Sequence, residues 1–387
     1  MIYQAPPLSS ADEQVLTKIN ELREDLRFLL VSPRRWYGTL RRAVFARAVQ
    51  GSNSIEGYHA SVEDVAAVIE EEEPMDTQEE TRQAISCYRD AMTYVLQAAK
   101  SKRTIDSSLL LALHYMIMKY DLGKNPGQWR PGANQVVDQD GRIVYTAPDR
   151  EWVEELVEET LDDISRSEHP VMVTAAMAHL NLALVHPWSD GNGRMARCLQ
   201  TLVLATERTP DPVFSSIEEY LGRNTPRYYA VLAEVNDGQW SPWRDTRPWI
   251  EFCLTAHYRQ GRTLQRRIEQ FEALWNQCEH LAALHRLPDR VVDALADAAR
   301  GRTLWRSLYV KITRSSLGEK ISDTQGTRDL LSMHRAGLLE AVGAKRGRRY
   351  RATPELSAVW GNIRTQRPSM RVEDPYEDIS RRRLPSI

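Results

Sequence analysis

Apolar residues recur at every third or fourth position along most of the chain, which is the spacing of one buried face of an α-helix. The first such stretch runs from Val15 to Leu30, with the cap-type residues Ser9 and Asp12 before it and Pro33 after it. Further helices are expected at 37–49, 62–71, 77–99, 107–119, 151–164, 171–185, 194–205, 218–222, 226–235 and 248–284. The pattern therefore predicts an all-α fold class.

One segment interrupts the helical spacing. Residues 135–145 contain two runs of β-branched residues on either side of Asp140-Gly141, which is typical of a β-hairpin. An isolated hairpin is marginal in water, so we expect it to lie against helices.

The longest apolar stretch, 171–185, is shorter than the roughly 18 residues of a membrane span and contains His179 and Asn181. It predicts a buried helix and no membrane partner. The N-terminal residues show no basic segment followed by an apolar one, so no secretory signal is expected. We interpret His179, and His114 in another apolar run, as core residues without a ligand.

The overall composition excludes several classes of protein. The 51 Lys and Arg residues nearly balance 53 Asp and Glu, and the net charge of −2 argues against a chain that binds nucleic acid along its whole length. The 4 cysteines form no CxxC pair, which argues against a zinc site and indicates reduced thiols in the cytoplasm.

The charge balance changes locally near the C-terminus. Residues 286–351 contain 15 Lys and Arg and 7 Asp and Glu, a difference of +8. The order is helix, short helix, helix (324–339) and then a basic segment at 343–350, which predicts a winged-helix-like module. Such modules bind DNA, recognise a protein or join subunits, and the sequence leaves these alternatives open.

The chemistry is concentrated in residues 186–197, HPWSDGNGRMAR, between two predicted helices. Gly191 and Gly193 let the backbone approach a ligand, and the free N–H groups at the start of the following helix favour an anion. Arg194 and Arg197 are three residues apart on that helix, so both guanidinium groups lie on one face. This pattern indicates a phosphate site.

Two other residues of this segment fit the same interpretation. Asp190 would repel an anion unless a divalent cation bridges the two, as when Mg²⁺ is held by a carboxylate and substrate phosphates. The side chain of His186, with an ordinary pKa near 6.5, is suited to accept a proton from a hydroxyl group.

Residues 186–197 resemble the signature H-x-F-x-[DE]-G-N-G-R-x-x-R of the Fic family, with Trp188 where Phe is usual. The resemblance covers roughly residues 50–254. It implies a Fic helical core in which residues 135–146 form a flap. It also implies the activity of a protein adenylyltransferase, which transfers AMP from ATP to a Ser, Thr or Tyr hydroxyl of a target protein.

The resemblance also implies a role for each signature residue. His186 would be the general base, and Asp190 would hold Mg²⁺ against the α- and β-phosphates. Gly191, Asn192 and Gly193 would form the anion hole. In the same way, Arg194 would contact the β-phosphate and Arg197 the γ-phosphate.

Upstream, Ser52-Asn53-Ser54-Ile55-Glu56-Gly57 is similar to the inhibitory motif [ST]-x-x-x-E-[GN] of many Fic proteins. In the members that carry this motif on an N-terminal helix, its glutamate pairs with the last arginine of the signature. The resemblance therefore implies that Glu56, with Ser52 at the start of the motif, binds Arg197 and holds the enzyme inactive.

Two further segments match the family by position. In the flap, Ile143, Val144 and Tyr145 would lie nearest the site and dock the target backbone. The segment around Tyr228, Tyr229 and Asn236 would line the nucleotide, although its spacing fits core residues equally well.

The sequence pattern and the resemblance together predict the following regions. Residues 1–90 form an N-terminal helical region with the inhibitory motif, 91–255 the catalytic core, 256–285 a connecting helix, 286–355 the winged-helix-like domain and 356–387 a mobile tail. Three alternatives stay open: removal of AMP or transfer of another phosphate-containing group at the same site, a DNA-binding regulator with a nucleotide-sensing Fic domain, and a homodimer.

Overall fold

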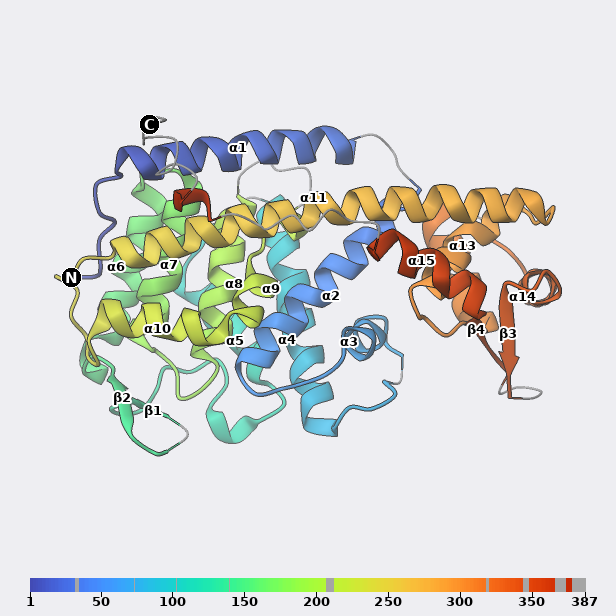
Figure 1. Cartoon of the computed structure of the whole chain (residues 1–387). Helices are drawn as coiled ribbons and strands as arrows, with labels where there is room; N and C mark the ends of the chain where they lie inside the picture. Colours follow the sequence, from blue (N-terminus) through green and yellow to red (C-terminus); the bar gives the residue numbers. More distant parts are fainter. Residues whose placement is uncertain are drawn as a thin grey trace, which may run out of the picture. The chain divides into compact units, whose positions relative to one another are not determined.

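The computed structural model describes residues 1–31, 35–72, 74–101, 103–138, 140–206, 212–317, 320–343, 348–365 and 374–377. The chain divides into two compact units (Figure 1). The first comprises Met1–Arg27, Val44–Arg262 and Glu373–Ile387, and the second comprises Phe28–Ala43 and Thr263–Val372.

The first unit is helical apart from one hairpin. Its own helices are α3 (Val62–Ile69), α4 (Glu79–Lys100), α5 (Ser107–Met118), α6 (Val153–Arg166), α7 (Val171–Val185), α8 (Asn192–Ala205), α9 (Glu218–Arg223) and α10 (Thr225–Asn236). Three more helices, α1 (Ser10–Val31), α2 (Tyr37–Ile55) and α11 (Arg247–Leu284), contribute residues to both units.

The core of the first unit is the pair α7 and α8, which pack against each other and are covered by α4, α5 and α6 (Figure 1). Nearly every side chain of α7 is buried, as its apolar sequence predicts. Two of its buried polar side chains bond residues far away in the sequence: Asn181 bonds both backbone groups of Tyr3, and His179 bonds Gln200 and Tyr228. This core fixes the loop between α7 and α8.

The hairpin expected around Asp140-Gly141 is present as β1 (Gln135–Val137) and β2 (Ile143–Thr146). The strands are antiparallel, with Gln135 opposite Thr146. The Asp138 carboxylate accepts hydrogen bonds from two backbone N–H groups of the turn, and Gly141 supplies the positive φ that the turn requires.

The second unit contains α12 (Val292–Ala299), α13 (Arg306–Leu317), α14 (Asp323–Arg335), β3 (Leu339–Val342), β4 (Arg349–Ala352) and α15 (Pro354–Thr365). The strands β3 and β4 pair antiparallel. On the other side of β4, Leu304 forms an isolated β-bridge with Tyr350 through two backbone hydrogen bonds of 2.8 Å.

Two boundaries in this unit differ from the sequence-based expectation. The helix expected at 324–339 ends at Arg335, because Gly337 turns the chain with a φ of 73° and the buried Leu338 and Leu339 lead into β3. Residues 354–365, assigned mostly to a tail, form α15, which the buried Leu356 anchors. Residues 344–347, 366–373 and 378–387, including much of the expected basic segment and tail, lie outside the described residues.

The all-α fold class is confirmed, with two small hairpins as its β structure in the described residues. Among those residues, no helix combines the length and the hydrophobicity needed to cross a lipid bilayer.

The C-terminal part of α2 packs directly against the backbone of α9. A Cβ atom built on Gly51 would lie 2.5 Å from the carbonyl oxygen of Glu218, and one built on Gly222 would lie 2.6 Å from the Cα atom of Gly51. Real Cβ atoms do not approach so closely, so only glycine fits at both positions.

We predict that Gly222→Ala destabilises the protein by about 1–3 kcal/mol, the usual cost of overpacking, because α2 and α9 must separate. Gly38→Ala on the same helix α2 is the control, since a Cβ atom there meets only ordinary contacts and alanine favours a helix. Thermal denaturation of the two variants measures the difference. Equal melting temperatures would contradict the prediction.

Candidate active site

Two residues of the signature segment, His186 and Gly191, have left-handed backbone conformations that direct the chain from α7 into α8. His186 caps α7 with φ 52° and ψ 57°, an uncommon conformation for a residue with a side chain. Gly191 caps α8 with φ 76°, and a Cβ atom there would lie 2.9 Å from the Met118 sulfur. The glycine is therefore required both by its φ angle and by the close approach of α5.

The carbonyl groups of this loop are held by residues that the sequence analysis did not assign. The side chain of Arg130 donates to the carbonyl of His186 at 3.0 Å, and its backbone N–H donates to the carbonyl of Pro187 at 2.9 Å. The other two guanidinium nitrogens of Arg130 donate to the carbonyls of Gly132 and Pro148, at the two ends of the flap. Arg130 is buried, so it ties the flap to the catalytic loop from inside.

His114 holds the other end of the loop. Its Nδ1 accepts from the backbone N–H of Gly127, so the proton sits on Nε2, which donates to the carbonyl of Asp190 at 3.0 Å. Burial lowers the pKa of His114 to about 4, which keeps it neutral in this role. The interpretation of His114 as a satisfied core residue stands, but its partner is the site itself.

Trp188 and Asn192 brace the centre of the loop. The Trp188 ring is buried and stacks on His114, with centroids 4.7 Å apart, so Trp fills the position where Phe is usual. The Asn192 amide bonds both backbone groups of Trp188 at 2.9 Å. The Asn192 side chain thus shapes the loop, and only its backbone remains for an anion.

The imidazole of His186 is oriented for proton transfer. A carbonyl can only accept, so the 3.2 Å contact with Ala183 places the proton on Nδ1 and leaves the lone pair on Nε2. Burial and the nearby charge of Arg130 lower the pKa of His186, against the opposing effects of Glu56 and Asp190. The neutral form required of a base is favoured at neutral pH.

Both carboxylate oxygens of Asp190 have partners in this structure. Its Oδ1 accepts from the N–H of Gly191 at 2.5 Å, and its Oδ2 lies 3.6 Å from the amine of Lys124. The described part of the chain has no group of three His, Cys, Asp or Glu side chains that would hold a metal alone. Mg²⁺ fits this donor set, because it commonly uses one carboxylate and completes its shell with phosphates and water.

Arg194 lies in a cage of two tyrosines. Its guanidinium stands 5.2 Å from the ring centre of Tyr58 and 5.7 Å from that of Tyr120, and it donates to the Tyr120 hydroxyl and the Met118 sulfur. Its Nε is buried with no hydrogen-bond partner in the described residues. Tyr58 directly follows the motif Ser52–Gly57, so this segment contacts both Arg194 and Arg197.

Arg197 is held by the inhibitory motif. Its Nε donates to the Ser52 hydroxyl at 2.7 Å, and its Nη2 donates to the Ser52 carbonyl at 3.0 Å and to the Glu56 carboxylate at 2.5 Å. The remaining nitrogen, Nη1, is buried and unpartnered within the described residues. Burial lowers the pKa of the Arg197 guanidinium, but the negative charge of Glu56 outweighs this effect and holds the pKa above its ordinary value.

The Glu56 carboxylate also stands directly over the start of α8. A Cβ atom on Gly193 would collide with Glu56 Oε1 and lie 3.1 Å from Arg197 Nη1. The negative group thus occupies the place where backbone N–H groups and the two arginines converge. Two buried guanidinium nitrogens without acceptors, beside a helix N-terminus, form a site for an anion.

Comparison with known proteins agrees with this geometry. Residues 104–204 match the Fic/DOC family. The chain contains a Fic domain. It is 25% identical over 256 residues to the protein adenylyltransferase Fic of Nematostella vectensis, covering 64% of this chain and 55% of that protein. It is 27% identical over 255 residues to the protein adenylyltransferase fic-1 of Caenorhabditis elegans, covering 64% and 46%. The chain spans about half the length of these relatives.

Solved structures show the same Fic fold. A Fic family protein from Desulfovibrio desulfuricans superposes with a TM-score of 0.59 at 23% identity, covering 91% of this chain and 99% of that one. Fic-1 from C. elegans superposes with a TM-score of 0.52 at 22% identity, covering 67% and 73%.

Three residues expected at the rim of the Fic site lie elsewhere. Tyr145 is buried and donates to the Leu184 carbonyl at 2.5 Å, so of the three flap residues expected to dock the target, Ile143 and Val144 are exposed and Tyr145 is not. Tyr228 is buried with its hydroxyl 2.9 Å from His179, which leaves it no free surface for a nucleotide.

Asn236, the third, is buried and accepts from the N–H of Gly238. Of the expected nucleotide-lining residues, Tyr229 is 48% exposed, and it donates to the carbonyl of Ile55 beside the inhibitory motif. It is the residue of this segment that remains placed to contact a nucleotide.

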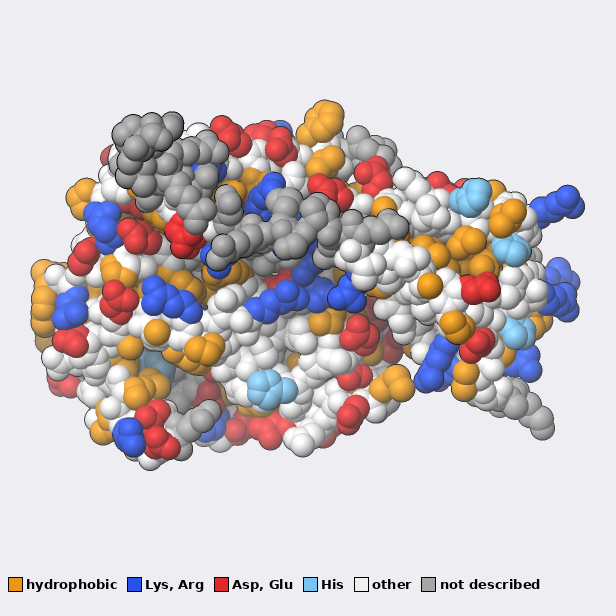
Figure 2. Space-filling model, in the orientation of Figure 1, with side chains coloured by type: hydrophobic (Ala, Val, Ile, Leu, Met, Phe, Trp, Pro, Cys, Tyr) orange, Lys and Arg blue, Asp and Glu red, His pale blue; other side chains and the backbone are white. Residues whose placement is uncertain are grey.

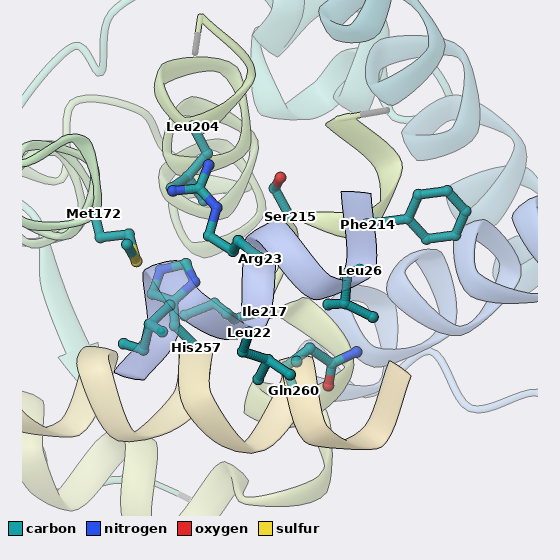
Figure 3. Close-up of a pocket in the computed structure, with 12 residues that line it drawn as sticks. Leu22, Arg23, Leu26, Met172, Leu204, Phe214, Ser215, Ile217, His257 and Gln260 are labelled. Carbon is teal, nitrogen blue, oxygen red and sulfur yellow. The ribbon is translucent and has the colours of Figure 1, made fainter. Parts of the chain in front are cut away.

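A separate small cavity lies between α1, α7, α8 and α11 (Figure 3). Its volume is about 40 Å³, and Met172, Ile217 and His257 are among its lining residues. Burial lowers the pKa of His257 to about 3. No residue of the signature lines this cavity, and it is too small for a nucleotide, so the Fic site is the loop described above.

Arg130 yields a prediction that does not depend on activity. Its charge lowers the pKa of His186, so the neutral variant Arg130→Met should raise that pKa, whereas Arg130→Lys should leave it closer to wild type. NMR titration of ¹⁵N-histidine-labelled protein measures the change, with His186→Ala identifying the signal. An unchanged or lower His186 pKa in a folded Arg130→Met protein would contradict this role.

Proposed function

We propose that this Fic domain is a protein adenylyltransferase that transfers AMP from ATP to a Ser, Thr or Tyr hydroxyl of a target protein, and that Glu56 holds it inactive. The observation that supports the proposal is the Glu56 carboxylate on Arg197, whose Nη1 is buried and has no acceptor among the described residues. The names of the relatives point to the same activity.

The proposed reaction uses the residues of the loop. His186 Nε2 accepts the proton of the target hydroxyl, whose oxygen bonds to the α-phosphorus of ATP. The bond from that phosphorus to the bridging oxygen of the β-phosphate breaks, and pyrophosphate leaves. The N–H groups at the start of α8, with Arg194 and Arg197, stabilise the phosphate charge. Asp190 would hold Mg²⁺, which supplies further charge neutralisation when bound.

The proposed brake follows from electrostatics. Glu56 forms a charge-assisted pair with Arg197 at 2.5 Å, and Ser52 takes two more of its donor positions. A γ-phosphate that approached Arg197 would meet a carboxylate of the same sign. ATP therefore binds in a productive position only after Glu56 leaves Arg197.

The flap supplies an edge for the target. Ile143 and Val144 are 55% and 44% exposed on β2, and the buried Tyr145 fixes that strand to the end of α7. We propose that the target backbone lies along this hairpin next to His186.

The four free, buried cysteines support a reducing compartment and hence the cytoplasmic location proposed from the sequence.

We predict that Glu56→Gly increases auto-modification by ATP and Mg²⁺ about tenfold or more, because a charge-assisted hydrogen bond contributes about 1.5–3 kcal/mol and 1.4 kcal/mol is a factor of ten. Intact mass should show the addition of one or more adenylyl groups. Ser52→Ala, which removes a single hydroxyl contact with Arg197, should give a smaller increase.

The double variant Glu56→Gly/His186→Ala is the control for the general base. It should bind ATP but transfer no AMP, because no other group then accepts the hydroxyl proton. A Glu56→Gly protein that binds ATP without any increase in transfer would contradict the brake, and transfer by the double variant would remove His186 from the role of base.

We keep hydrolytic removal of AMP from a modified protein as an alternative, in which the Glu56 carboxylate would orient the attacking water and AMP would be released. Incubating wild type with an AMP-modified protein tests this alternative. Separate incubations with ATP, UTP and CDP-choline, followed by intact mass, identify the donor, because each adds a different group.

A further inference from the structure

The exposed charged side chains of the second unit are mostly basic. In the described part of 292–365, ten Lys and Arg side chains are exposed, against three acidic ones. The acidic side chains are Asp323, Glu340 and Glu355. The basic ones are Arg306, Lys311, Arg314, Lys320, Arg328, Arg335, Arg348, Arg349, Arg351 and Arg364.

The imbalance arises because other acidic side chains of this unit are buried and paired with arginines. Asp329 accepts from Arg290 at 2.7 and 3.1 Å and from the Tyr309 hydroxyl at 2.9 Å. Asp297 pairs with Arg302 at 3.1 Å and with Arg300 at 3.5 Å. Their negative charge is neutralised inside the unit, so it does not offset the positive surface.

Helix α14 presents one polar and basic stripe. Its inner face is formed by Gly326, Asp329, Leu330 and Met333, which are buried. At Gly326 a Cβ atom would lie only 3.0 Å from the Val310 side chain, so α13 and α14 pack closely there. On the opposite side, Thr324, Arg328, Leu331 and Arg335 follow one another at helical spacing, and both arginines are exposed.

The β3–β4 hairpin is fixed beside the end of α14. His334 Nδ1 donates to the carbonyl of Leu339 at 2.7 Å, and Tyr350 faces inward against Leu304. The neighbours of Tyr350, Arg349 and Arg351, therefore point outward. The Arg349 guanidinium lies 4.4 Å from the ring centre of Trp305, so it is held in position. Figure 2 shows Lys and Arg side chains at the end of this unit that carries α14 and the hairpin.

We propose that the second unit binds duplex DNA, with α14 in the major groove and the β3–β4 hairpin along the adjacent phosphate backbone. The order of two packed helices followed by a hairpin is that of a winged-helix module, whose second helix enters the groove. The major groove is about 12 Å wide and admits one α-helix. Arg328 and Arg335 are two turns apart, or roughly 10 Å along the axis, so both reach one groove segment.

This surface suits DNA better than a membrane or an acidic peptide. The outer side of α14 carries Thr324, Arg328 and Arg335, and none of its large apolar side chains is exposed for insertion into lipid. The hairpin adds cations on a second, rigid element at the end of the helix, and a straight polyanion with regularly spaced charges is the partner that contacts both elements.

The test is binding of the full-length protein to a fluorescein-labelled duplex of mixed sequence, measured by anisotropy at 50 mM salt and above. We expect binding whose affinity falls steeply with salt. Arg328→Glu and Arg335→Glu should each weaken binding about tenfold or more. Arg364→Glu on α15 removes the same charge from the same unit but away from the stripe, and it should change the affinity less than about twofold.

Each outcome decides the question. Binding that is lost equally in all three variants would indicate only non-specific attraction to the net charge and would overturn the proposed surface. No binding at 50 mM salt, or tighter binding to single-stranded DNA or to an RNA duplex, would overturn it as well. Melting temperatures confirm that each variant is folded. Adenylyl transfer is not part of the readout, so this result is independent of the function proposed for the Fic site.

Discussion

A buried guanidinium group requires an anion, and the site depends on this requirement at Arg197. The side chain is held in the interior by its place on α8. Its positive charge cannot be left there without a negative partner, because burying an unpaired ion is costly. In this structure the partner is Glu56. In the mechanism that we propose, Glu56 and the phosphate of ATP therefore compete for one cation, and the fold needs no separate element to couple them.

That competition is effective only if the loop is rigid. The left-handed conformations of His186 and Gly191 are uncommon or require glycine, and they persist because the surrounding contacts determine them. Arg130 and His114 hold the carbonyls at the two ends of the loop. With the carbonyls fixed on one side, the N–H groups at the start of α8 face the site without rearrangement, which is the preorganisation that charge stabilisation requires.

Much of the fold could be predicted from the sequence because helix periodicity and the Asp-Gly turn are local signals. The signature residues, too, could be found because they are contiguous. The boundary near Leu339 was wrong because apolar spacing does not distinguish the end of a helix from the start of a strand, and Gly337 alone indicated the turn. Arg130 was missed because two of its carbonyl partners, His186 and Pro148, are distant in sequence and no pattern of side chains marks a backbone carbonyl as a partner.

Long-range packing also explains why the number of charged residues in the sequence does not give the charge that a binding partner meets. The near-neutral total and the local excess both treat each ionised residue as equal. In the first unit, Arg194 and Arg197 are buried at the site, so they add little to the charge of the surface. In the second, the buried Asp297 and Asp329 pair with Arg300, Arg302 and Arg290, so these opposite charges cancel within the unit. Burial, which depends on long-range packing, decides which charges a partner meets, and composition cannot supply it.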